Sequence, residues 1–189
     1  MDSPEYRVKF EKAAKLLDGD IDLDGMSLPR PGFFERRKLR KALVAFQEAA
    51  EASKENAAPL LLLGKIEERL GNLQANSKWL KKANEVEPNN LVIVLEFGAS
   101  LAKQGFHQEA ADLLAPMAEA HPNDPRVHCN LALSLLLAGD APSAVAAFEH
   151  VFNLEPEVQV NQRLLKFAVD VSGGLIPYPK SEADIARYV

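Results

Sequence analysis

The sequence is poor in cysteine, in positive charge and in long apolar runs, and each shortage excludes a class of protein. Cys129 is the only cysteine among 189 residues, so the chain forms no internal disulfide and no cysteine-rich zinc site. Its 22 Lys and Arg against 27 Asp and Glu give a net charge of −5, which argues against sequence-independent nucleic-acid binding. No apolar run approaches the roughly 20 residues that span a bilayer. We expect a cytoplasmic protein with no nucleic-acid partner and no membrane insertion.

What the sequence does contain is a repeat with a period of 34 residues. The period connects four glycines, Gly71, Gly105, Gly139 and Gly173. It also connects large apolar residues in two further registers, which are Leu63, Phe97, Leu131 and Leu165, and then Leu80, Leu114 and Phe148. Three successive units close on a proline, at Pro88, Pro122 and Pro156. Several independent registers at one period indicate a repeat architecture.

Each unit has the pattern of two helices joined by a glycine turn. In one unit the pattern predicts helices over 91–103 and 107–120, with Gly105 between them. A helix end commonly needs a residue in the left-handed conformation, which glycine adopts without steric cost. The next unit opens with Asp124 and Pro125, a capping side chain followed by a proline that suits the first helical position.

At these residues the chain resembles the tetratricopeptide-repeat family. The clearest matches are Leu63-Gly64, Gly71, Leu80, Ala83 and Pro88, then Phe97-Gly98, Gly105, Ala110, Leu114 and Pro122, and then Leu131-Ala132, Gly139, Ala144, Phe148 and Pro156. The resemblance implies an all-α, right-handed superhelical solenoid of antiparallel helix pairs, with small residues where paired helices approach closely. It implies one domain, 1–189, with three clear repeats over 57–90, 91–124 and 125–158.

The two ends of the chain read as degenerate repeats. Residues 1–56 match a repeat whose helices, 5–17 and 35–52, are separated by a loop inserted at 18–33. Residues 159–189 match one more first helix, 159–171, and a tail in which Ser181 caps a short helix that reaches Tyr188. Pro116 falls inside a predicted helix, so we expect either a kink or a shifted boundary there.

Two short motifs suggest chemistry, and neither completes its pattern. The stretch Asp20-Ile-Asp-Leu-Asp-Gly25 resembles the start of a calcium-binding EF-hand loop, but Pro31 stands where the bidentate glutamate is needed. We expect a solvated acidic loop, with calcium binding as the minor alternative. His128 and Cys129 are neighbours, and neighbours on a helix point about 100° apart, so they do not form a nucleophile–base pair. We expect no catalytic residue, no metal and no cofactor.

The first helices carry more large apolar residues than one packed face needs, as in Leu60–Leu63 and Leu131–Leu137. In the family the first helices line a concave surface. The resemblance therefore implies a partner-binding groove formed by Leu61, Lys65, Leu95, Ala99, Arg126, Cys129, Leu133, Leu136, Arg163 and Phe167. We expect a non-catalytic, monomeric module that binds a protein or peptide in this groove. The alternative is a structural, oligomerising or accessory domain whose own tail, 175–189, covers the groove.

Overall fold

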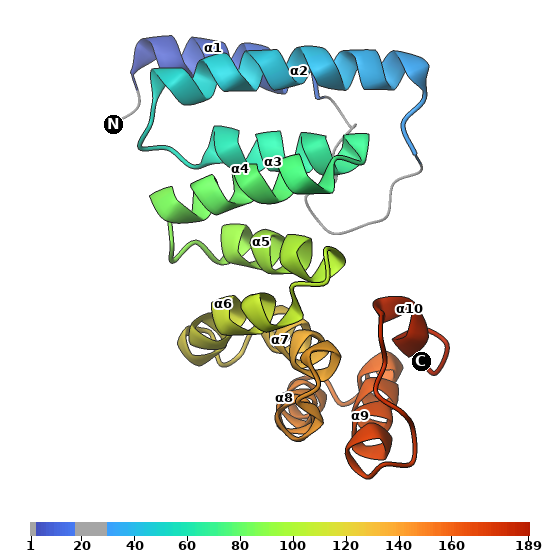
Figure 1. The fold of residues 1–189 in the computed structure, drawn as a ribbon. Coiled ribbons are helices and arrows are strands. Elements are labelled where there is room, and N and C mark those ends of the chain that lie inside the picture. The colour runs from blue at the N-terminus through green and yellow to red at the C-terminus, as the bar shows by residue number, and fades with distance from the viewer. Residues whose placement is uncertain (1–2, 18–29) are drawn as a thin grey trace. The chain divides into compact units, whose positions relative to one another are not determined.

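The structure is a computed structural model that describes residues 3–17 and 30–189 of the chain. Within these ranges every regular element is a helix, which confirms the predicted all-α class (Figure 1). The chain divides into two compact units, Met1–Ile93 and Val94–Val189. Each unit is described by itself, and the prediction of one domain over 1–189 stays a prediction.

The first unit contains two helix pairs, with α1 against α2 and α3 against α4. Their bounds are α1 Pro4–Ala14, α2 Phe33–Ala52, α3 Ala58–Leu70 and α4 Leu73–Val86. The predicted helices 5–17 and 35–52 are thus present with shifted ends. Side chains from α1, α2 and α3 meet in one apolar cluster, which contains Ala13, Leu17, Leu39, Ala42, Phe46, Leu63, Ile66 and Leu70.

The second unit continues the helix pairs and ends in a short helix. Its helices are α5 Leu91–Lys103, whose first turn begins in the first unit, α6 His107–Ala120, α7 Pro125–Ala138, α8 Ala141–Leu154, α9 Gln159–Ser172 and α10 Glu182–Ile185. The predicted bounds of α5 and α6 are confirmed. Pro116 lies inside α6, so the helix boundary is not shifted. The last helix is shorter than predicted because it ends at Ile185 rather than near Tyr188.

The glycine turns follow the prediction in three repeats and depart from it in the fourth. Gly71, Gly105 and Gly139 have φ angles of +87°, +84° and +92°, the left-handed conformation that favours glycine at a helix end. Gly173, the fourth glycine of the period, has φ −80°. Its neighbour Gly174 takes the left-handed conformation instead, with φ +72°.

Small residues allow the paired helices to approach each other, as the repeat pattern predicts. A Cβ atom added to Gly64 of α3 would lie 2.8 Å from Cγ of Leu80 on α4. One period later, a Cβ atom on Gly98 would lie 3.1 Å from the side chain of Leu114. Leu80 and Leu114 are both fully buried, so each leucine fills the space that its facing glycine leaves open.

Candidate functional site

The predicted groove residues fall mainly on two registers of the 34-residue period. One register, which we name the Leu95 row, contains Leu61, Leu95, Cys129 and Arg163. The other, which we name the Phe167 row, contains Lys65, Ala99, Leu133 and Phe167. Each register places one residue on α3, α5, α7 and α9 in turn. Arg126 and Leu136 lie at the two ends of the same stripe on α7.

Only Leu61 and Lys65 belong to the first unit, and both have partners within it. Leu61 is half-buried and packs against a small cluster that includes Ala57, Ala83 and Ile93. Lys65 is 8% exposed, and its Nζ lies 3.2 Å from a carboxylate oxygen of Glu68 on the next turn of α3. A buried lysine remains charged at low cost only when such a carboxylate accompanies it.

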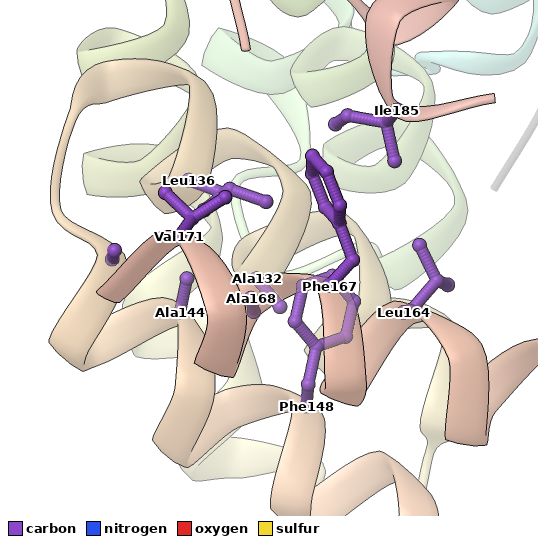
Figure 2. Close-up of a cluster of buried hydrophobic side chains, with 10 residues drawn as sticks. Ala132, Leu136, Ala144, Phe148, Leu164, Phe167, Ala168, Val171 and Ile185 are labelled. Atoms are coloured by element: carbon purple, nitrogen blue, oxygen red, sulfur yellow. The ribbon is translucent and has the colours of Figure 1, made fainter. Parts of the chain in front are cut away.

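Leu136 and Phe167 lie in the core of the second unit rather than on an open surface. Leu136 is 0% exposed and Phe167 is 2% exposed. Both belong to one apolar cluster with Ala132, Ala141, Ala144, Phe148, Leu164, Ala168, Val171 and Ile185 (Figure 2). A partner therefore cannot contact either side chain in this conformation. The family resemblance implied a place on the groove floor because a register identifies a helix face and not what packs over it.

The cover over Phe167 is the C-terminal tail of the chain. Figure 2 shows Ile185 of α10 pointing toward the ring of Phe167 on α9, and Ile185 is only 4% exposed. The ring of Tyr188 lies 4.9 Å from that of Phe167, centroid to centroid. Ile176 and Val189 pack against the same cluster. The tail thus covers Phe167, which is the residue of the Phe167 row that lies on α9.

One polar contact joins the tail to α9, and others stabilise the tail itself. Arg163 of α9 is exposed, and its Nη1 donates a hydrogen bond of 2.6 Å to the Val189 carbonyl oxygen. Ser181 caps α10, with its Oγ accepting from the Asp184 amide. The Asp184 carboxylate accepts from the Lys180 amide at 3.1 Å. This hydrogen bond and a second one from Ser181 lower the pKa of Asp184, since both favour the charged form.

The remaining predicted residues of the second unit are half-buried or exposed. Leu95, Ala99, Cys129 and Leu133 are half-buried, and Cys129 and Leu133 pack against the edge of the core cluster. Arg126 is exposed and forms a two-point pair with Asp124, with Nη2 to Oδ2 at 2.6 Å and Nε to Oδ1 at 3.0 Å. The guanidinium lowers the pKa of Asp124. Because Asp124 also caps α7, the ion pair holds the Arg126 guanidinium at that helix end.

The structure brings together two histidines that are distant in the sequence. The ring centroids of His128 and His150 lie 4.2 Å apart, and His150 Nε2 is 2.6 Å from the Pro122 carbonyl oxygen. Burial, and then the charge of His150, lower the pKa of His128. Burial, and then Glu155, raise the pKa of the Cys129 thiol. A raised thiol pKa disfavours the thiolate, which is the nucleophilic form.

Within residues 3–17 and 30–189, no group of three or more His, Cys, Asp or Glu side chains is placed to hold a metal ion. The acidic stretch Asp20–Gly25 lies outside these ranges, so its calcium alternative stays a prediction.

The profile of the tetratricopeptide repeat matches residues 32–85 and 95–151, which is more than half of the chain. The chain belongs to the tetratricopeptide repeat family. Among solved structures, residues 41 to the end of MamA from Desulfovibrio magneticus RS-1 superpose with a TM-score of 0.73 at 19% identity, covering 100% of this chain and 93% of that one. YrrB, described as a tetratricopeptide repeat protein with an unusual peptide-binding site, superposes with a TM-score of 0.60 at 20% identity, covering 71% of this chain and 69% of that one. MamA of MSR-1 gives 0.68 at 16% identity over 98% of each chain. These superpositions show a shared fold, and no curated protein matches the chain.

Proposed function

We propose that this tetratricopeptide repeat protein is a non-catalytic interaction module that binds a peptide or helical segment of another protein. The proposed site is the first-helix face of the second unit, formed by Leu95, Ala99, Cys129 and Leu133. Membership of a family of helical repeats favours a binding role over catalysis, because stacked repeats present extended faces to a partner.

The observation that carries the proposal is the way in which the tail sits on α9. A helix of 4 residues, Glu182–Ile185, inserts one isoleucine beside Phe167, and Arg163 holds the chain that follows. This is a small apolar anchor with one directional hydrogen bond, a combination that fits helix-in-groove recognition. The tail therefore serves as an internal example of the kind of segment that this face accepts.

The proposed partner extends this mode along the Phe167 row. Leu133 holds on α7 the position that Phe167 holds on α9, and Ala99 holds it on α5. A large apolar side chain set against Leu133 would gain about 1.5–3 kcal/mol on full burial. Because the helices are already packed, the receptor loses little conformational freedom on binding, which favours affinity.

Affinity capture from the native source tests the proposal, with the wild type compared with Leu133→Glu and Ala99→Glu. Ala146→Glu, which adds the same charge at an exposed site on α8, is the matched control. Circular dichroism should confirm that each variant retains its helices. We expect a protein that is captured by the wild type and the control and lost with both face variants. A captured set that is the same for all four proteins would refute the site.

The packing of the tail on α9 also favours a second candidate. In this candidate the protein is a structural domain whose own tail covers its first-helix face. In this reading the tail completes the core, and the protein acts through self-association or as an accessory part of a larger assembly. Light scattering over a range of concentrations separates the two candidates. A concentration-dependent oligomer whose formation Leu133→Glu leaves unchanged would support the second one.

A further inference from the structure

The exposed face of α2 carries aromatic and basic side chains that the proposed groove does not use. Phe33 is 78% exposed, Phe34 is 82% exposed and Val44 is 56% exposed. Arg37, Arg40 and Lys41 are exposed as well. At 3.6 residues per turn, all six lie within an arc of about 120° on the helix. We name these six residues the α2 patch.

The rest of α2 explains why these six side chains face outward. Leu39, Ala42, Phe46 and Ala49 are fully buried and form the opposite stripe of the helix. Near the start of the helix, Arg36 donates a hydrogen bond of 3.2 Å to the Leu70 carbonyl oxygen, and Glu35 pairs with Arg69. The helix is therefore fixed to α3 on one side, and its outer side is left to the patch.

The beginning of α2 also stands clear of its neighbour α1. α2 has 20 residues and α1 has 11, and Figure 1 shows α2 running well past the end of α1. Phe33 and Phe34 form the first turn of α2, with their ring centroids 5.6 Å apart in an edge-on arrangement. The two rings are thus exposed together in the first turn of α2, which suits insertion into an apolar phase.

The charge of this segment is opposite to that of the whole chain. Residues 30–41 hold six Lys or Arg and one Glu, a net charge of +5, in a chain whose net charge is −5. Glu35, the single acidic residue, is paired with Arg69 on α3. Within the part of the chain that the structure describes, no carboxylate forms an ion pair with Arg37, Arg40 or Lys41. Arg37, Arg40 and Lys41 thus carry positive charge that no ion pair within the described ranges neutralises.

We propose that the α2 patch docks the protein on an anionic lipid surface. The Phe33 and Phe34 rings enter the interface, while Arg37, Arg40 and Lys41 contact lipid phosphate groups. A helix face with phenylalanine beside Lys and Arg is typical of interfacial membrane binding, and the long basic side chains can reach the headgroups from the interface. The backbone of α2 stays packed on its unit, and no helix of the described ranges is long and apolar enough to cross a membrane.

Co-sedimentation of the full chain with vesicles tests the proposal. We expect binding to phosphatidylcholine vesicles that contain phosphatidylserine, weak binding to phosphatidylcholine alone, and release at about 1 M salt, where charges are screened within roughly 3 Å. Arg37→Gln with Lys41→Gln should weaken binding by about 25-fold, since each basic side chain near an anionic surface contributes about fivefold. Phe33→Ala with Phe34→Ala should weaken it by about tenfold or more.

Lys78→Gln with Lys81→Gln is the matched control, because it removes the same charge from exposed positions on α4. We expect it to retain binding within about twofold of the wild type. Equal losses in the α4 and α2 charge variants, or equal binding to both kinds of vesicle, would overturn the proposal. Binding to soluble polyglutamate without binding to vesicles would also overturn it and assign the patch to an acidic polypeptide.

Discussion

The packing of the tail on α9 leads to a prediction about Ile185, which is 4% exposed and packs beside Phe167. Ile185→Ala removes most of this apolar contact. Full burial of an isoleucine is worth about 1.5–3 kcal/mol, and truncation to alanine in a packed site costs about 2–5 kcal/mol. Because α10 is short and peripheral, we take about 2–3 kcal/mol as the loss in docking free energy. Each 1.4 kcal/mol is a factor of ten, so the docked-to-undocked ratio should fall by roughly 30- to 140-fold.

Hydrogen exchange measured by mass spectrometry reports this ratio segment by segment. The Ala186 amide donates to Glu182 at 2.9 Å and the Tyr188 amide donates to Ile185 at 2.9 Å, so both are protected only while the tail is folded. We expect exchange in the 180–189 segment to accelerate by about the same factor, up to the limit set by an open chain. Exchange in α3 and α4, which lie in the other unit, should be unchanged.

Leu175→Ala is the control for this experiment, since Leu175 lies in the same tail and is 79% exposed. It should leave exchange as in the wild type. The reasoning is refuted if Ile185→Ala leaves the tail as protected as before, which would mean that Tyr188 and the Arg163 hydrogen bond suffice. It is also refuted if exchange rises equally in α3 and α4, which would mean that Ile185 stabilises the whole chain rather than the tail.

Three further predictions concern the packing and the titrating groups. Gly64→Ala should destabilise the protein by up to about 2 kcal/mol in urea melts, since overpacking against Leu80 costs about 1–3 kcal/mol and the helix-propensity gain offsets only about 1 kcal/mol. Gly98→Ala should cost less, because its Cβ would lie 3.1 Å rather than 2.8 Å from the facing leucine. The pKa of His128 is lowered from its ordinary value of 6.5. Between the folded pKa and pH 6.5, the unfolded chain therefore binds more protons than the folded chain does. The free energy of unfolding should fall as the pH drops through this range. His128→Gln should flatten that slope, and a slope equal to that of the wild type would contradict the assignment. Because the pKa of Cys129 is raised, its alkylation at neutral pH should be slower than that of glutathione, and a faster rate would reopen the nucleophile interpretation.

The repeat made most of the helical architecture predictable. A period of 34 residues specifies which positions must be small, which must be large and where a turn needs glycine, and the two Gly–Leu contacts between paired helices follow from it. The bounds of α5 and α6 were predictable because Gly105, Pro122 and Pro125 mark them chemically. The ends of α1 and α10 were less predictable, since neither helix has a glycine of the period at its end.

The groove residues were harder to predict because a periodic register identifies a face and not what covers it. Leu133 and Phe167 occupy equivalent positions, yet one is half-buried and the other is 2% exposed. The difference arises from Ile185 and Tyr188, which belong to a segment with no counterpart in the earlier repeats. The pair of His128 and His150 was equally hidden, because it depends on how α7 packs against α8.

The α2 patch was also hard to predict from the repeat, because it lies on a helix face that the repeat pattern does not specify. Read as part of a repeat, residues 35–52 were interpretable only through Ala42, Phe46 and Ala49, which are buried and in register. The repeat pattern leaves the outer face of a second helix unspecified, so selection can place any chemistry there without disturbing the fold. Phe33, Phe34 and the basic residues that follow use this freedom, because exposed aromatic rings add nothing to the packing of α2. A repeat protein can therefore carry specific chemistry at positions that the period does not specify, as in the tail on α9 and on the outer face of α2, and substitutions at exposed positions there should change binding without unfolding the chain.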